Sequence, residues 1–571
     1  MAVRRKDSAQ TRLFLILIVF IASLAAIAAR LVVVQYVEAK KFTAMAMSQR
    51  LREVELSGER GNIYDRNGQE LAVNRDAASV YATPYFIKDA AAAALKLAPI
   101  LGQKPSDIEA KLRQKTGFVY LARQLDMDVV NEIKALKLTG INYLPERKRY
   151  YPNGTLAAHT VGFAGVDNQG LAGVESVYDE VLKGKSGKLL VEGDPAGAPI
   201  PGGIYSRQDA TEGDPVYLTI DKDIQYKAEV ELNNVVNDYG AVGGSVIVMD
   251  PKTGDILAMA SAPGFDPNAF GQATEPQLLD RAIGQVYEPG STAKVITASA
   301  ALEEKAVGLD EVFSLPASIT VAGQEFGEYD GVAKGDQTIE GIVALSSNVG
   351  AIELAQRLGK DKLYKYMRSF GLGSKTGVDL AGEEAGILPA PDDWSDVSIA
   401  TIPYGQGVSG TTLQMVDVVA AIANDGQKPK PHVLKRIDRS AHGAAGPSFQ
   451  TKDTRVISEE TARRMQSIMV DTVENGTGKN ARIPGYEVGG KTGTAQKAGP
   501  NGYEPGKLIV TFVGYVSNLD PQLAIIVSVD EPQATGPQLL YAATIAAPVF
   551  RDIAEFSIKQ LKIAPGGREL R

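Results

Sequence analysis

The longest apolar run of the chain lies near its N-terminus, where the 17 residues 13–29 include no charged side chain. One arginine, Arg30, follows this run, and residues 31–34 are apolar again. A helix of that length measures about 25 Å, and an Arg30 side chain extended toward the interface would let it cross a bilayer core of ~30 Å. The pattern predicts a transmembrane anchor over residues 13–36.

The charges beside this run predict its orientation. Four basic residues precede it, namely Arg4, Arg5, Lys6 and Arg12. Because basic flanks stay in the cytoplasm, residues 1–12 are predicted to be the cytoplasmic tail of a single-pass protein of the plasma (inner) membrane, with its bulk on the periplasmic or extracytoplasmic side. A cleaved signal peptide is the alternative, since Ala26-Ile27-Ala28 resembles a cleavage site. Apolar residues continue past that site, which favours an uncleaved anchor.

After the anchor, residues 37–235 alternate strand-like runs with helix-like and turn-rich segments, and none of them has the arrangement of a catalytic site. The pattern predicts an elongated α+β pedestal. Its predicted parts are a strand ending in an Asn-Gly turn, two helices, the start of a short helix, and a loop rich in glycine and proline, at residues 60–68, 87–114, 126–137, 170–175 and 192–203.

A second composition begins near residue 240 and predicts a separate domain over residues 240–562, followed by a tail at 563–571. Its predicted elements are two early strands, two late strands with the turn between them, and a C-terminal amphipathic helix, at residues 245–250, 256–260, 508–516, 523–529, 518–521 and 541–561. A long, mostly helical insertion separates the strand pairs. Folding must therefore bring early and late strands into one antiparallel sheet covered by helices, so the fold class is α+β.

The composition excludes several kinds of chemistry. A net charge of −8 argues against a nucleic-acid partner, which would need a basic face. The chain has no cysteine, which excludes disulfides, thiol catalysis and thiolate metal sites. The three histidines, His159, His432 and His442, lack ligand spacing, so no metal site is predicted. A His-Asp-Ser triad is the alternative that they leave open, and isolated surface histidines are the simpler interpretation.

The first motif with candidate chemistry is Ser291-Thr292-Ala293-Lys294. Turn-forming residues precede it and an alanine-rich segment follows, so Ser291 is predicted at a helix N-terminus. Lys294 lies one turn further on the same face, where its amine can reach the serine oxygen. A neutral, buried lysine can take the proton that makes a serine nucleophilic. In isolation, a capping serine with a surface lysine is the commoner meaning of this spacing.

The second motif, Ser346-Ser347-Asn348, lies between two apolar helical runs. Ser346 could relay a proton between the lysine and a leaving group, and Asn348 could hold a substrate amide. Alone, this motif would be an ordinary turn between helices.

The third motif, Lys491-Thr492-Gly493-Thr494, is predicted on a strand whose glycines let a ligand backbone come close. An extended peptide could pair along that edge, with its carboxylate held by Lys491, Thr492 and Thr494. The backbone N–H groups of about Ala495 and of the first motif's serine are predicted to form an oxyanion hole. A glycine-containing turn is the alternative, but the three motifs together predict one serine acyltransferase cleft.

These three motifs in this order are the signature of penicillin-binding proteins and serine β-lactamases. Over nearly its whole length the chain resembles class B penicillin-binding proteins, the monofunctional peptidoglycan transpeptidases. Besides the anchor, the resemblance includes residues 60–68, 149–152, 170–175 and 404–407. It implies a dimerisation-like pedestal at 37–235 and a penicillin-binding (transpeptidase) fold at 240–562.

By that resemblance, Ser291 is the acyl acceptor and Lys294 its base, while the other motif residues complete catalysis and bind substrate: Ser346, Asn348, Lys491, Thr492, Gly493 and Thr494. The implied reaction is D,D-transpeptidation. Ser291 attacks the D-Ala-D-Ala bond of a stem peptide, expels the terminal D-alanine, and passes the acyl group to the amine of a neighbouring stem. A β-lactam would mimic D-Ala-D-Ala and acylate the same serine. The resemblance implies no metal or organic cofactor.

The resemblance is greatest to the cell-division (septal) type, and the elongation type is the alternative. It implies a polytopic membrane glycan polymerase of the FtsW/RodA type and other division proteins as partners. A hydrolase, either a D,D-carboxypeptidase or a β-lactamase, would use the same acylation but transfer the acyl group to water. The anchor and the pedestal argue against a hydrolase. A membrane β-lactam sensor would need a cytoplasmic output domain, for which the predicted 12-residue tail is too short.

Overall fold

The structure is a computed structural model that describes residues 8–56, 58–192, 205–439, 453–499, 502–517, 522–533 and 541–564. The chain divides into two compact units, the first made of residues 1–59 and 184–212 and the second of residues 60–183 and 213–571. Four predicted segments lie partly or wholly outside the described residues: the tails at 1–12 and 563–571, the loop at 192–203, and the turn at 518–521. The domain borders predicted near residues 36 and 235–240 stay predictions.

The first unit contains the apolar helix α1 (Ser8–Val32), which continues through the π-helical turn η1 (Val33–Val37). Residues Gln10–Val37 form a helical stretch of 28 residues, and an 18-residue window of it has a mean hydropathy of 2.7 and no buried residue. An exposed apolar helix of this length has the dimensions of a membrane span. The predicted apolar helix is therefore confirmed.

Helix α2 and a three-stranded sheet complete the first unit, and the strands are ordered β1-β6-β7. Their bounds are α2 (Ala39–Arg50), β1 (Leu51–Leu56), β6 (Gly187–Glu192) and β7 (Tyr205–Gln208). Both strand pairs, β1 with β6 and β6 with β7, are antiparallel.

The second unit begins with a sheet ordered β18-β8-β2-β3-β4, in which β5 also pairs with β3. Its strands are β2 (Ile63–Tyr64), β3 (Glu70–Ala82), β4 (Val119–Asp126), β5 (Ile141–Tyr150), β8 (Val216–Leu218) and β18 (Leu434–Ile437). The helices beside it are α3 (Ala90–Leu101), α4 (Pro105–Leu112) and α5 (Met127–Ala135). The single helix predicted over 87–114 is therefore two, because Gly102 takes a left-handed conformation (φ 61°) that ends α3.

A buried ion network lies beside this sheet, next to α7 (Gly173–Val177). The Arg60 guanidinium donates to Glu175 at 2.5 Å, and Arg149 donates to the other oxygen of that carboxylate at 2.6 Å. Arg60 also donates to Asp179 at 2.7 Å. The side chains of Arg60 and Glu175 are fully buried, and a buried charge is stable only beside an opposite charge. Three of the segments that carry the resemblance, 60–68, 149–152 and 170–175, each contribute one residue to this network.

A second sheet of five strands has the order β10-β9-β22-β21-β20. Its strands are β9 (Gly243–Met249), β10 (Ile256–Ala262), β20 (Glu487–Gly499), β21 (Gly502–Ser517) and β22 (Leu523–Asp530). β22 pairs antiparallel with β9, so early and late strands meet as predicted. In this sheet β20 lies at one edge.

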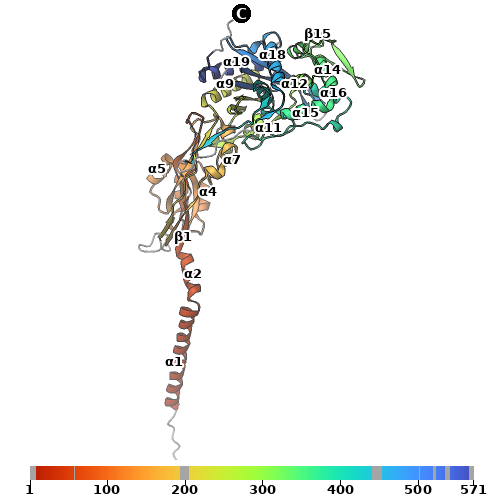
Figure 1. Ribbon diagram of the computed structural model, residues 1–571. Coiled ribbons are helices and arrows are strands. Elements are labelled where there is room, and N and C mark those ends of the chain that lie inside the picture. The colour runs from red at the N-terminus through yellow and green to blue at the C-terminus, as the bar shows by residue number, and fades with distance from the viewer. Residues whose placement is uncertain are drawn as a thin grey trace, which may run out of the picture. The chain divides into compact units, whose positions relative to one another are not determined.

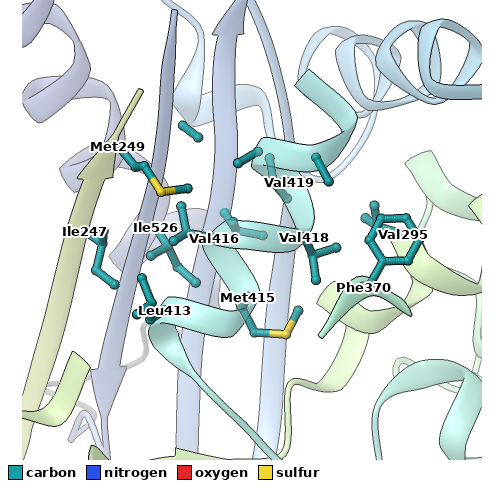
Figure 2. Packing of buried hydrophobic residues seen from close by; sticks show 14 of the residues in the cluster. Ile247, Met249, Val295, Phe370, Leu413, Met415, Val416, Val418, Val419 and Ile526 are labelled. Carbon is teal, nitrogen blue, oxygen red and sulfur yellow. The ribbon is translucent and has the colours of Figure 1, made fainter. Parts of the chain in front are cut away.

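Helices cover both faces of this sheet. On one face, α9 (Lys222–Asp238) and α19 (Ala542–Gln560) share a core with Ile525 and Val527 of β22. On the other face lies α17 (Thr412–Ala423), which is buried along its whole length. Figure 2 shows Val416 of α17 toward Ile526 of β22 and Val418 toward Val295 on the opposite side. α17 is thus the layer between the sheet and the helices that carry the first two motifs.

Most of the remaining elements lie in the insertion between the strand pairs, and a few lie before β9. The larger helices among them are labelled in Figure 1. The helices are α6 (Ala158–Val161), α8 (Asp179–Leu182), α10 (Glu275–Leu278), α11 (Arg281–Gly284), α12 (Lys294–Glu303), α13 (Ile339–Ala344), α14 (Asn348–Leu358), α15 (Lys360–Phe370), α16 (Ser398–Thr401) and α18 (Glu459–Glu474). The short strand pairs are β11 (Val286–Tyr287) with β16 (Gly410–Thr411), β12 (Phe313–Leu315) with β15 (Gly335–Gln337), β13 (Ser318–Val321) with β14 (Gln324–Gly327), and β17 (Gln427–Lys428) with β19 (Thr454–Arg455). The 3₁₀ turns are η2 (Pro84–Phe86), η3 (Pro267–Gln272), η4 (Gly290–Ala293), η5 (Pro391–Asp393), η6 (Ile402–Tyr404) and η8 (Lys479–Ala481).

Candidate active site

Ser291 lies at the start of a helix, as predicted, and the first turn of that helix is the 3₁₀ turn η4, which runs into α12. Gly290, the residue directly before Ser291, has a positive φ of 55°. A Cβ at Gly290 would lie 3.1 Å from the Cβ of Ala495, so the serine turn packs closely on β20. Glycine is suited to this position both by its φ and by the short distance.

Ser346 and Ser347 connect α13 to α14. Ser346 has φ 60°, a left-handed conformation that non-glycine residues rarely adopt. The hydroxyl of Ser347 caps α14 by accepting the N–H of Gly350 at 2.9 Å. Together, the turn and the cap fix the direction in which the second motif faces.

The third motif, Lys491–Thr494, lies in the middle of the edge strand β20 rather than in a turn. The strand pairs with β21 on one side, with Lys491 opposite Val513, and has no strand neighbour on its other side among the described residues. A Cβ at Gly493 would lie 2.8 Å from the methyl group of Thr292. Glycine therefore lets β20 approach the serine turn, and the predicted edge position is confirmed.

The three motifs meet at one cavity of about 370 Å³. Its lining includes Ser291 from the first motif, Ser346 from the second, and Thr492 and Thr494 from the third. The other lining residues are Glu328, Tyr329, Asp330, Lys334, Leu345, Thr477, Tyr541, Ala542 and Ala543. Residues up to 203 positions apart in the sequence (494 − 291 = 203) thus share this cleft.

Lys294 joins the first motif to the second. Its Nζ donates to the carbonyl oxygen of Ser346 at 2.5 Å and to Oδ1 of Asn348 at 2.7 Å. From the sequence we expect the amine to reach Ser291, but among the described residues no hydrogen bond joins the two side chains. Catalytic hydrogen bonds are often loose without a bound substrate, and the amine is held by the second motif instead.

Lys491 joins the third motif to the second. Its Nζ donates to the hydroxyl of Ser346 at 2.8 Å, while that hydroxyl lies 3.4 Å from Nζ of Lys294. Thr492 is linked in turn to Thr477, with 2.9 Å between the two hydroxyl oxygens. Ser346 therefore lies between two lysine amines, as a residue that relays protons must.

Both lysines lie in buried surroundings, which favour the neutral amine over the ammonium ion. Lys294 is 1% exposed and Lys491 is fully buried. Burial lowers the pKa of Lys294 well below the usual value of lysine, and the neighbouring charge of Lys491 lowers it further. Burial lowers the pKa of Lys491 to about 7. Burial and the charge of Lys491 thus shift Lys294 toward the neutral amine, the form that a general base needs.

The hydrogen bonds of Lys294 determine where its lone pair can act. A neutral amine has two N–H groups and one lone pair, and two acceptors, the Ser346 carbonyl and the Asn348 amide, already take the two N–H groups. The lone pair is then left for a further proton donor. A serine hydroxyl in the shared cavity is such a donor, so the arrangement suits removal of a serine proton.

Several residues of the site carry no recognisable signal in the sequence. Glu328 accepts hydrogen bonds from the second motif although it lies about twenty residues earlier, after β14. Tyr329 and Tyr541 meet edge to face, with 5.9 Å between ring centroids, at the cavity wall. Their separation along the chain leaves no local pattern, so only the folded structure identifies them.

The segment 404–407 has a clear structural place. The carbonyl of Gly405 accepts the N–H of Gly290 at 3.2 Å, and the N–H of Gly407 donates to the Glu288 carboxylate at 2.9 Å. Glu288 also accepts the hydroxyl of Tyr503 at 2.9 Å. This segment thus holds the turn that precedes Ser291 from the side.

The histidines do not support the triad alternative. His159 bonds to the carbonyl of Gln277 and His432 pairs with Asp255, while His442 lies outside the described residues. Neither described histidine lines the cavity. In the part of the chain that the structure describes, no group of three or more His, Asp or Glu side chains has the arrangement of a metal site.

Comparison with protein families agrees with this geometry. The family profile described as the penicillin binding protein transpeptidase domain matches residues 244–555, and that of the penicillin-binding protein dimerisation domain matches residues 55–218. The chain belongs to the class B penicillin-binding proteins. The transpeptidase match contains all three motifs, and the dimerisation match contains the buried arginine–glutamate network.

Individual class B penicillin-binding proteins are similar over most of their length. Stage V sporulation protein D of Bacillus subtilis is 37% identical, over 94% of this chain and 83% of that protein. Peptidoglycan D,D-transpeptidase FtsI of Escherichia coli is 34% identical, over 90% of this chain and 86% of that protein. The crystal structure of penicillin binding protein 3 of Mycobacterium tuberculosis, complexed with aztreonam, matches with a TM-score of 0.70 and 31% identity, over 90% of this chain and 99% of that chain.

Proposed function

We propose that this class B penicillin-binding protein is a serine-type D,D-transpeptidase that cross-links peptidoglycan stem peptides through an acyl-enzyme on Ser291. The observation that carries the proposal is the meeting of three motifs at one cavity, with a buried lysine whose pKa is lowered. The similarity to peptidoglycan D,D-transpeptidase FtsI of Escherichia coli supports the same reaction class.

In the proposed acylation, the lone pair of Lys294 takes the proton of Ser291 while the serine oxygen attacks the carbonyl carbon between the two D-alanines. The carbonyl electrons move to its oxygen, which the backbone N–H groups of Ser291 and about Ala495 stabilise. When the intermediate collapses, the C–N bond breaks and the leaving amine takes a proton from the Lys294 ammonium. Ser346 can relay this proton because it lies between the amines of Lys294 and Lys491.

The substrate residues have matching roles in this proposal. The peptide pairs along β20, where Lys491, Thr492 and Thr494 hold its terminal carboxylate, and Gly493 allows the close approach. Asn348 holds a substrate amide. In the second half-reaction, the amine of a neighbouring stem peptide attacks the ester of Ser291 and forms the cross-link. In this proposal a β-lactam enters the first half-reaction only. The crystal structure of the Mycobacterium tuberculosis relative complexed with aztreonam supports the binding of β-lactams.

The assignment of Ser291 is tested by covalent labelling. A fluorescent penicillin should label the protein, and Ser291→Ala should abolish the label because no other group would form the ester. Labelling of the alanine variant at the rate of the natural protein would show that the nucleophile lies elsewhere.

Transpeptidation is separated from hydrolysis by the fate of the acyl group. Purified protein given a stem-peptide thioester and a D-amino acid should form the exchanged peptide. Release of the free acid alone would favour a carboxypeptidase or a β-lactamase. The match to a dimerisation domain over residues 55–218 supports the transferase, since a hydrolase has no need of that module.

We assign the enzyme to septal wall synthesis, as in FtsI-type proteins, with a polytopic membrane glycan polymerase and other division proteins as its partners. The FtsI match over 90% of the chain supports this assignment. Fluorescently tagged protein should gather at midcell in dividing cells. An even distribution along the side wall would instead favour the elongation type.

The N-terminal helix is proposed as a single-pass anchor of the plasma membrane with its N-terminus in the cytoplasm. The 28-residue apolar stretch supports the span, and the basic residues before it support the orientation. The catalytic cavity would then face the periplasmic or extracytoplasmic side, where peptidoglycan is assembled.

A further inference from the structure

Glu328 is a buried carboxylate that the proposed mechanism does not use. Glu328 is only 6% exposed. Its backbone N–H donates to the carbonyl oxygen of Ala317 at 2.8 Å, which fixes its position after β14. The carboxylate accepts the hydroxyl of Ser347, the N–H of Asn348 at 2.8 Å and the N–H of Val349 at 3.4 Å. A single side chain therefore holds the start of α14 at three points.

The same segment also fixes the side chain of Asn348. Its Nδ2 donates to the carbonyl of Gly327 at 3.0 Å, which leaves Oδ1 facing Lys294 at 2.7 Å. If the amide turned over, its NH₂ group would face the lysine amine and its oxygen would face a carbonyl. The bond to Gly327 would be lost, and the NH₂ group could donate only to the lone pair of Lys294 that the serine proton needs. Gly327 and Glu328 together therefore keep the oxygen of Asn348, and not its NH₂ group, beside Lys294.

We propose that Glu328 is a positioning residue for the acylation of Ser291. It holds the turn of the second motif so that the Ser346 carbonyl and the Asn348 amide take both N–H groups of Lys294, and the lone pair remains for the serine proton. This inference rests on the proposed function of Ser291 and Lys294.

The charge of Glu328 gives the same residue a second effect. The charged groups that act on Lys294 are Lys491, Glu328 and Lys334. Burial and the charge of Lys491 lower the pKa of Lys294, Glu328 raises it, and Lys334 lowers it. Glu328 therefore stabilises the ammonium form, and loss of its charge lowers the pKa of the base further. The acid limb of the acylation rate then moves to lower pH.

Two substitutions separate position from charge. Glu328→Gln keeps the length of the side chain and can still accept from Asn348, but it removes the charge. Glu328→Asp keeps the charge but is one methylene shorter, so it cannot reach all three donors. Glu325→Gln is the matched control, since Glu325 is an exposed carboxylate on β14 of the same hairpin.

The measurement is the rate constant of labelling by fluorescent penicillin from pH 5 to pH 10, divided by the folded fraction from thermal melting. Penicillin carries a carboxylate, so its rate should fall again as Lys491 loses its charge, and the plateau is the maximum rate above the acid limb. Glu328→Asp should lower the plateau by about tenfold or more, because buried donors lose their acceptor, and leave the midpoint of the acid limb in place. Glu328→Gln should keep most of the plateau and move that midpoint to lower pH. Glu325→Gln should match the natural protein.

The role of Glu328 is overturned if Glu328→Asp keeps the plateau within twofold or if Glu328→Gln keeps the midpoint. Failure of the proposed function would give a different result, because Ser291→Ala would then still be labelled. An unlabelled Ser291→Ala together with unchanged Glu328 variants contradicts only the inference about Glu328.

Discussion

At the scale of single residues, the site depends on the contrast between two lysines that face the same hydroxyl. Lys294 and Lys491 both donate toward Ser346, yet only Lys294 is fixed by two further acceptors of the second motif. Two ammonium groups so close repel each other in a buried site, so one of them gives up its proton more readily. This geometry supports the proposed roles, in which Lys294 transfers the proton and Lys491 meets the anionic substrate.

Replacement of Lys294, the proposed base, by arginine should show whether acylation needs its positive charge or its ability to accept a proton. Lys294→Arg keeps a positive charge, but a guanidinium does not give up its proton at neutral pH. The rate constant of acylation by penicillin should fall by about 10²–10⁴-fold, the usual contribution of a general base. Lys305→Arg is the control, since Lys305 is exposed just after the end of the same helix. Labelling of Lys294→Arg within tenfold of the natural rate would contradict the assignment.

The pH dependence of the acylation rate should report the loss of a proton from each of the two lysines. Acylation by a peptide with a free carboxylate should rise with pH as Lys294 loses its proton. It should fall again as the pH passes the pKa of Lys491, about 7 in the free protein, because the neutral amine no longer attracts the carboxylate. Binding of the anion raises the pKa of Lys491, so the falling limb shifts upward when the substrate saturates the site.

A peptide with a C-terminal amide provides the control for this second limb. It reacts more slowly, and its rate should not fall at alkaline pH because it has no carboxylate for Lys491 to bind. An equal fall for both peptides in stopped-flow acylation would show that Lys491 does not bind the carboxylate.

At the scale of elements, close backbone contacts help to hold the serine turn in place. Gly405 has φ 82°, and a Cβ there would lie 2.3 Å from the carbonyl oxygen of Gly290. That distance is shorter than any real contact of a Cβ with an oxygen, so a larger residue must displace the turn that carries Ser291.

Gly405→Ala should therefore both destabilise the protein and slow acylation. Gly407→Ala is a matched control, because Gly407 also has a positive φ (75°), but a Cβ there would meet only ordinary contacts at 3.7 Å. The left-handed conformation alone costs alanine about 1–2 kcal/mol, and the clash at Gly405 adds about 1–3 kcal/mol. Thermal melting and penicillin labelling should show the larger loss at Gly405. Equal losses for both variants would mean that the contact with Gly290 is unimportant.

Elements whose signal is local could be predicted from the sequence. Alternating and apolar runs gave both strand pairs of the five-stranded sheet, and turn chemistry before an alanine-rich segment placed Ser291 at a helix start. Contacts between distant segments could not be predicted. The pairing of β18 with β8 joins residues about 216 apart (434 − 218 = 216), and nothing local marks it. The hydrogen bonds from Ser347 and Asn348 to Glu328 could not be predicted for the same reason.

At the scale of the whole molecule, all eight predicted site residues lie in the second unit, and the apolar helix lies in the first. Among the described residues, the cavity lining belongs to the second unit. In the proposed topology, the apolar helix sets on which side of the membrane the cavity works. Orientation is then a property of the flanking charges, and it can be tested apart from catalysis.

The absence of cysteine from the natural chain allows that test without background. Ser8→Cys places a thiol at the start of α1, and Asn233→Cys places one on the exposed side of α9. With the N-terminus in the cytoplasm, a membrane-impermeant maleimide should label Asn233→Cys in intact spheroplasts and should label Ser8→Cys only after lysis. The natural protein should give no signal in either condition. Labelling of Ser8→Cys in intact spheroplasts would reverse the orientation, and its loss from the mature chain by mass would instead indicate a cleaved signal peptide.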